Sequence, residues 1–304
     1  MTSNDFYKAR SYSGCIGAAF NLFCANFATL FKKTWMFALV FSVICGLYAF
    51  VAFHAPTNAG QPMTLGRIAL TTCAALAIVV CALVANSRTK AGFLSLTNGY
   101  TVKQNFTKHM KVTAILAACT VVVSIISLAA NMGLTHFFIT HKTSASTAGT
   151  VLMCTSAAIT FLFAMACLPF AYSATRFLMH NAKAKEMFGR HYHTGVKHLG
   201  FLFIIAIIVT LIILVINVFM ALPAYITATA SQMDSFGVQN GDPSGLPPYF
   251  AWLSFLTISI VSFILTYAMF WVDLVLCYAY GTIETEVTEE AMLHKNANDT
   301  TQAD

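Results

Sequence analysis

Six long apolar runs, separated by short polar connections, constrain this chain more than any other feature. A helix of about 20 residues crosses roughly 30 Å of hydrocarbon, and each run is about that long. The runs cover residues 35–53, 66–85, 112–134, 151–172, 199–222 and 249–280. We therefore expect an all-α polytopic membrane protein with six transmembrane helices.

The basic residues are distributed unevenly between these runs. Fifteen of the seventeen Lys and Arg residues lie in segments that alternate crossings would place on one side, and only Arg67 and Lys142 lie on the other. Because Lys and Arg are enriched in cytoplasmic loops, we expect both termini to be cytoplasmic. Basic loops that face anionic lipid also explain the net charge of +6, so no nucleic-acid partner is expected.

The composition leaves no room for a soluble domain. Charged residues make up 9% of the chain, compared with about 25% in soluble domains, and hydrophobic residues make up 58%. We predict a polar N-terminal segment at 1–13, one six-helix domain at 14–282, and an acidic, disordered C-terminal tail at 283–304.

The segments on the basic side share a plan. Before the first run, Phe20, Phe23, Phe27 and Phe31 follow at helical spacing and Lys32 and Lys33 close the segment. This pattern predicts an amphipathic helix lying on the membrane. Similar segments at 92–111 and 177–198 precede the third and fifth runs. We therefore predict an internal repeat of three parallel hairpins, each preceded by an interfacial helix.

Asp273 is the one acid within a run, and it is a candidate intramembrane acid. Its position about 36 Å along the last run favours a rim acid paired with Arg88, Arg176 or an inner Lys over a proton or cation relay. Small residues recur every four positions in the second run, which predicts a closely packed helix face: Ala69, Cys73, Ala77, Cys81 and Ala85.

The basic side also carries candidate contacts for lipid phosphates, and the alternative is that these residues only orient the protein. They are Lys32, Lys33, Arg88, Lys111, Arg176, Lys183, Lys185, Arg190 and Lys197. His191, His193 and His198 are weak candidates for a metal site, since residues two apart on a helix point in different directions. The cysteines are isolated, with no CxxC pair, and no cofactor is expected.

Two local features concern helix ends. Pro169 lies near the inner end of the fourth run, where a helix end is favoured over a hinge. The segment 223–248 is rich in turn-forming residues and predicts the longest outer loop.

Two motifs carry a family resemblance: Phe-Lys-Lys-Thr-Trp at 31–35 and Thr-Gly-Val-Lys-His-Leu-Gly-Phe-Leu-Phe at 194–203. Residues 14–282 resemble a broad group of uncharacterised bacterial six-helix membrane proteins. That group is similar in pattern to the membrane-anchor domain attached to some glycerophosphodiester phosphodiesterases. The resemblance implies architecture and a bacterial cytoplasmic (inner) membrane. It implies no hydrolase activity, since the paired acids and histidines for that chemistry are absent from the sequence.

These observations favour two functions. The first is a non-enzymatic accessory or scaffolding protein that binds a protein partner or anionic membrane lipid. The second is a permease or carrier for a lipid or small apolar solute, whose path would be lined by polar residues such as Asn131 and Asn217. An enzyme is disfavoured because the spans and inner linkers lack clustered acids and any GxSxG motif.

Overall fold

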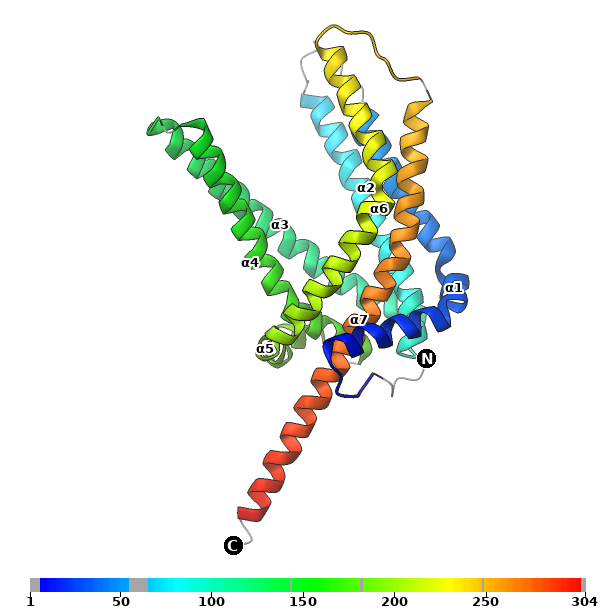
Figure 1. Cartoon of the computed structure of the whole chain (residues 1–304), viewed down its shortest axis with the longest axis vertical. Helices are drawn as coiled ribbons and strands as arrows, with labels where there is room; N and C mark the ends of the chain where they lie inside the picture. The colour runs from blue at the N-terminus through cyan, green and yellow to red at the C-terminus, as the bar shows by residue number, and fades with distance from the viewer. Residues whose placement is uncertain (1–5, 55–64, 143, 181–182, 248, 302–304) are drawn as a thin grey trace. The chain divides into compact units, whose positions relative to one another are not determined.

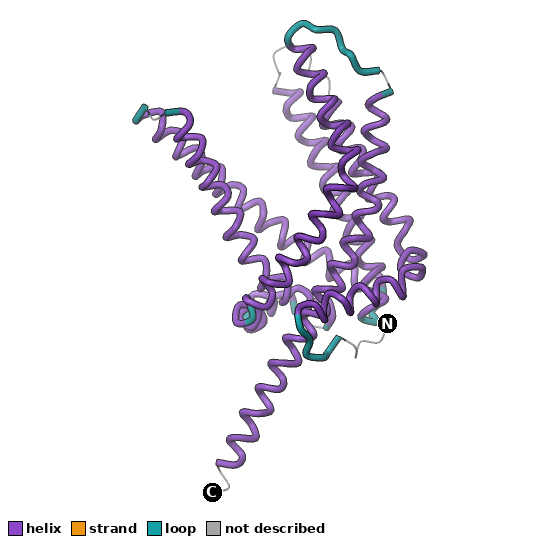
Figure 2. The backbone as a smooth tube through the Cα atoms, in the orientation of Figure 1, coloured by secondary structure: helices purple, strands orange, loops and turns teal. Residues whose placement is uncertain are grey.

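The structure is a computed structural model, and it describes residues 6–54, 65–142, 144–180, 183–247 and 249–301. Helices account for nearly all of this chain, and no strand occurs within these ranges (Figures 1 and 2). The elements are α1 (Tyr12–His54), α2 (Leu65–Thr97), α3 (Val102–Thr140), α4 (Ala145–Met179), the 3-10 helix η2 (Ala184–Phe188), α5 (Arg190–Lys197), α6 (Leu199–Gln239) and α7 (Phe250–Thr301).

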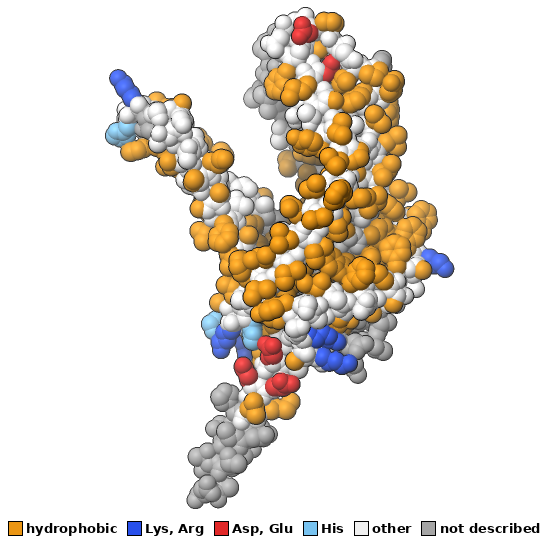
Figure 3. Space-filling model, viewed as in Figure 1, with side chains coloured by type: hydrophobic (Ala, Val, Ile, Leu, Met, Phe, Trp, Pro, Cys, Tyr) orange, Lys and Arg blue, Asp and Glu red, His pale blue; other side chains and the backbone are white. Residues whose placement is uncertain are grey.

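Six of these helices are long and apolar enough to cross a membrane: α1, α2, α3, α4, α6 and α7. The predicted all-α, multi-pass architecture is confirmed at this level. Large hydrophobic side chains are exposed along the helices, and few charged side chains interrupt them on the face shown in Figure 3. Apolar surface of this extent is expected where lipid rather than water covers the helices.

The predicted interfacial segments do not form three equivalent helices. The first is the start of α1, whose N-terminal part runs in a different direction from its remainder (Figure 1). The second is divided between the end of α2 and the start of α3. Only the third contains separate short helices, η2 and α5. The backbone is extended at His180 and at Lys183, which separates α4 from η2, and Gly189 separates η2 from α5.

Three helices extend beyond the predicted ends. α4 passes through Pro169 and reaches Met179. A proline is tolerated there because a neighbouring helix packs on it: a Cβ atom on Gly195 of α5 would lie 2.9 Å from the Pro169 Cα atom. α6 contains Pro223 and ends at Gln239, so the loop predicted at 223–248 is much shorter. The prediction of a helix end near Pro169 was therefore wrong, and residues 223–239 of the predicted outer loop are helical.

The third extension concerns the C-terminal tail. Residues 283–301, which the sequence analysis placed in a separate acidic tail, continue α7. The first of them are held by contacts: Ile283 is fully buried, and Glu284 and Glu286 meet basic side chains. The burial and pairing of these side chains offset the conformational entropy that is lost when this part of the chain is ordered.

The chain divides into two compact units. Unit 1 comprises residues 13–106 and 208–275, and unit 2 comprises residues 3–12, 107–207 and 276–304. In unit 1, Phe31 stacks on Tyr267 of α7, and Phe93 of α2 stacks on Phe270. In unit 2, the core is formed where Phe177 of α4 and Met187 of η2 are buried together.

Candidate functional site

In unit 2, the segment before α1 is held against α7 by close packing. Phe6 is fully buried, and its ring lies 4.9 Å from that of Tyr278. Its backbone contacts Gly281 so closely that a Cβ atom there would overlap the Phe6 carbonyl. Arg10 lies over the Tyr278 ring at 4.8 Å. The absence of a side chain at Gly281 therefore allows the N-terminal segment to reach the helix.

Beside this contact, α4 and α7 are joined by an ion pair. The Arg176 guanidinium donates to the Glu284 carboxylate, and the Tyr172 hydroxyl donates to the same oxygen at 2.5 Å. Tyr280 is buried next to them. Two donors on one carboxylate oxygen make Glu284 the centre of this network.

His180 closes the network at the end of α4. Its Nε2 atom lies 2.8 Å from the Tyr7 hydroxyl, and its backbone carbonyl accepts a hydrogen bond from Lys108 at 2.8 Å. Burial lowers the pKa of His180, and the charge of Arg176 lowers it further. Burial also raises the pKa of Tyr7. Both groups are therefore favoured in their neutral forms.

These side chains line a pocket of about 390 Å³. Its lining residues are Tyr7, Arg176, His180, Glu284, Thr285, Thr288, Glu289 and Met292. Arg176 was predicted to contact lipid phosphate, but its charge is already compensated by Glu284, and Glu289 adds a second carboxylate. A phosphate would have to compete with both acids. The pocket is better described as a polar junction between three segments.

The basic residues of the η2–α5 segment are arranged differently. Lys183, Lys185, Arg190 and Lys197 are exposed, and none of them forms an ion pair with a described residue. The Phe188 side chain in the same segment is 57% exposed. Exposed cations beside an exposed aromatic ring are typical of a segment at a membrane surface.

The remaining candidate lipid contacts fall into two groups. Lys32, Lys33 and Lys111 are exposed. Arg88 of α2 is half-buried, and its guanidinium lies 5.1 Å from the centre of the Phe37 ring and 5.9 Å from that of Phe106. Arg88 is thus positioned by aromatic contacts and is not neutralised by any described acid.

Asp273 lies in unit 1 and pairs with Lys90 of α2, whose Nζ atom donates to its Oδ1 atom at 2.9 Å. The other carboxylate oxygen is buried and has no partner among the described residues. The partner is thus an inner Lys, one of the partners considered from the sequence, and Arg88 and Arg176 lie elsewhere. This geometry fits a structural ion pair; whether Asp273 has a further role stays a prediction.

The histidines do not converge. His198 lies 3.6 Å from Glu286, whereas His193 is exposed and burial lowers the pKa of His191. Within the described residues, no group of three His, Cys, Asp or Glu side chains is placed to hold a metal ion.

Sequence reasoning missed Tyr7, Tyr172, His180 and Glu284 as members of a site. Two signals were present: a Phe in an otherwise polar N-terminal segment, and a Gly directly after the last apolar run. Comparisons with family models, curated proteins and solved structures find no match to this chain. The resemblance to the phosphodiesterase membrane anchor therefore stays a prediction, and function has to be argued from the structure.

Proposed function

We propose that this chain is a non-enzymatic accessory membrane protein that gathers anionic phospholipid at its η2–α5 segment. The observation that supports it most is the contrast between two groups of cations. Lys90 and Arg176 are compensated by acids of the same unit, whereas Lys183, Lys185 and Arg190 are exposed without such partners.

The electrostatic gain at this segment is substantial. Each basic residue near a membrane surface contributes about 1 kcal/mol of attraction to anionic lipid. Four exposed cations on 15 residues, together with the apolar Phe188 ring, thus supply both the charge and the apolar contact that surface segments use. Glu186 is the single acid among the described residues of 183–197, so the segment stays strongly positive.

The alternative function, a permease or carrier for a lipid or small apolar solute, has weaker support. The polar side chains proposed to line its path already form hydrogen bonds within the protein. Asn131 of α3 donates to the Ser156 hydroxyl of α4 at 3.0 Å, and the Asn217 amide donates to the Ile213 carbonyl of its own helix. Side chains that satisfy one another inside the helices are not a polar path for a solute.

The proposal is tested by extracting the protein with its surrounding lipid in a styrene–maleic acid copolymer and measuring the lipid composition by mass spectrometry. The wild type should be enriched in anionic lipid relative to the whole membrane. The variant K183Q/K185Q/R190Q/K197Q should lose this enrichment, and 0.5 M salt should weaken it in the wild type.

The matched control is K183R/K185R/R190K/K197R, which exchanges the same four side chains and keeps every charge. It should retain the enrichment. If the wild type shows no enrichment, or if the glutamine variant keeps it, the proposed function is wrong.

A further inference from the structure

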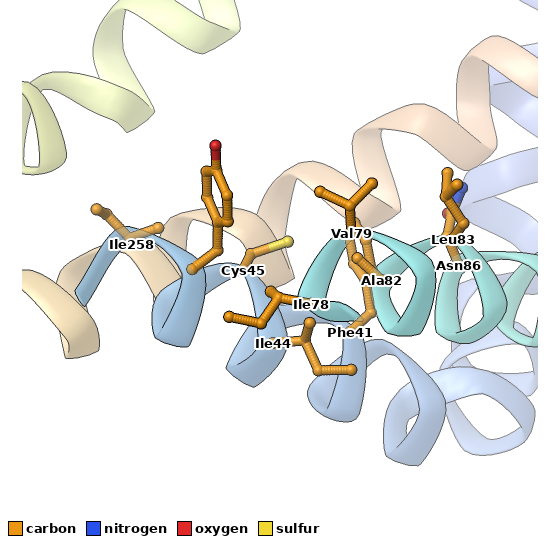
Figure 4. Close-up of a pocket in the computed structure, with 10 residues that line it drawn as sticks. Phe41, Ile44, Cys45, Ile78, Val79, Ala82, Leu83, Asn86 and Ile258 are labelled. Carbon is orange, nitrogen blue, oxygen red and sulfur yellow. The ribbon is translucent and has the colours of Figure 1, made fainter. Parts of the chain in front are cut away.

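Unit 1 contains an apolar pocket of about 550 Å³ between α1 and α2, to which Ile258 of α7 contributes. From α1 the pocket is lined by Phe41, Ile44, Cys45 and Tyr48, and from α2 by Ile78, Val79, Ala82, Leu83 and Asn86. Figure 4 shows these side chains in a row, with Ile258 at one end and Asn86 at the other.

The dimensions suit a hydrocarbon chain. The stretch of α2 from Ile78 to Asn86 rises by about 12 Å, which is close to the depth of about 15 Å of one leaflet. Because α1 and α2 run in opposite directions, Phe41 and Asn86 lie at the same end of the pocket. The distribution of basic residues predicts that this end faces the cytoplasmic leaflet.

A cation lies next to this end. Phe37 precedes Phe41 by one helical turn, so both project from the same side of α1. The Arg88 guanidinium lies over the Phe37 ring at 5.1 Å and is two residues beyond Asn86 on α2. Two residues of α2 rise by about 3 Å, and Phe37 is one turn from Phe41. The guanidinium thus lies just beyond this end of the pocket, where no described carboxylate compensates it. Lys90, the next cation of α2, is already paired with Asp273.

From this geometry we propose that unit 1 binds one anionic phospholipid, with an acyl chain in the pocket and the phosphate at Arg88. A guanidinium donates to phosphate oxygens in a bidentate manner, and Asn86 supplies a polar side chain at the same end of the pocket. This site is distinct from the lipid gathered at η2–α5. The pocket has room for one acyl chain, and Arg88 supplies one positive charge beside it. The site should therefore hold a single lipid and prefer a negative head group.

The experiment is native mass spectrometry after reconstitution with phosphatidylglycerol or phosphatidylcholine and transfer to detergent. The wild type should retain one phosphatidylglycerol at least tenfold more often than one phosphatidylcholine. Arg88→Gln should abolish this preference, Arg88→Lys should reduce it, and Ala82→Phe should prevent retention of either lipid by filling the pocket. The matched controls are Lys142→Gln, which removes a charge elsewhere, and Ala129→Phe, which adds a ring on an exposed face of α3.

Cys45 supplies a readout that needs no variant. Its side chain lines the pocket, whereas Cys81 on α2 is exposed and does not. Phosphatidylglycerol should slow the alkylation of Cys45 by a membrane-soluble maleimide, relative to phosphatidylcholine, and leave Cys81 unchanged. Equal retention of both lipids, retention unaffected by Arg88→Gln, or alkylation of Cys45 that ignores the lipid would each overturn the proposal.

The two lipid proposals can be rejected independently of each other. K183Q/K185Q/R190Q/K197Q should keep the retained lipid while losing the salt-sensitive enrichment, and Arg88→Gln should do the reverse. A wild type that loses all lipid in detergent but shows the enrichment would reject the pocket site alone.

Discussion

Arg176 and Glu284 form an ion pair between α4 and α7 although they are 108 positions apart in the sequence. Tyr172 donates to the same carboxylate, and the N-terminal segment lies next to it through Tyr7 and His180. Together these contacts join three parts of unit 2 that are remote in sequence.

Removing the charge of Glu284 should destabilise this junction. Glu284→Gln removes the carboxylate that is paired with the partly buried Arg176, and we expect a loss of about 2 kcal/mol in the free energy of unfolding. Tyr172→Phe removes one hydrogen bond and should cost about 1 kcal/mol. Thermal unfolding in detergent measures both.

The control is Glu290→Gln, which removes a carboxylate from the exposed part of α7. It should change stability by less than about 0.5 kcal/mol. An Arg176→Gln/Glu284→Gln double variant should lose less than the sum of the single losses, because the pair is coupled. Additive losses would show that the ion pair contributes nothing.

Composition and periodicity predicted the number and the approximate positions of the long helices, since both depend only on neighbouring residues. The partners of charged side chains could not be predicted in this way. Glu284 belongs to a segment that appears polar and unstructured in sequence, and its partner is fixed only when α4 and α7 are packed.

The second run shows the same limit. Its small residues every four positions predicted a packed face, but Cys73, Ala77 and Cys81 are exposed. Among the residues of this pattern whose burial is described, Ala85 alone is buried. The residues that face α1 across the pocket are instead larger ones such as Ile78 and Leu83. Small size permits close packing without requiring it, so the pattern identified a possible face and not the occupied one.

Gly281 provides a steric test of how the N-terminal segment is held. In Gly281→Ala the new methyl group would overlap the Phe6 backbone, so the segment should be displaced at a cost of about 1–3 kcal/mol. Hydrogen exchange at residues 6–10 should become faster. Gly133→Ala is the matched control, because no heavy atom lies within 4 Å of the added position. Equal protection in both variants would contradict this packing.

The same segment should respond to acid. Burial and the charge of Arg176 lower the pKa of His180 below its ordinary value of 6.5, so the unfolded state binds the proton first as the pH falls. Stability is therefore complete above about pH 6.5 and decreases below it. Tyr7, Arg176, Glu284 and Lys108 surround this imidazole.

Protection of residues 6–10 against hydrogen exchange, corrected for the intrinsic pH dependence, should accordingly fall between pH 7 and 5. His180→Gln should remove most of this change. The control His136→Gln replaces a histidine of α3 that is not part of this junction, and it should leave the change intact. A pH response that persists in His180→Gln would assign it to another group.

Asp273 and Lys90 supply the last test, which separates a structural acid from a functional one. Asp273→Asn leaves the Lys90 ammonium without a counterion, and Lys90→Met leaves a carboxylate whose second oxygen is already buried without a partner. Each should cost about 1–3 kcal/mol, and the double variant should lose less than the two together. If the double variant also keeps the lipid enrichment and the retained lipid of the wild type, the pair acts only in packing α2 against α7. If it folds but loses either lipid signal, Asp273 has a role beyond the ion pair. A purely structural pair would not have this effect, because the double variant leaves no unpaired charge to disturb the packing.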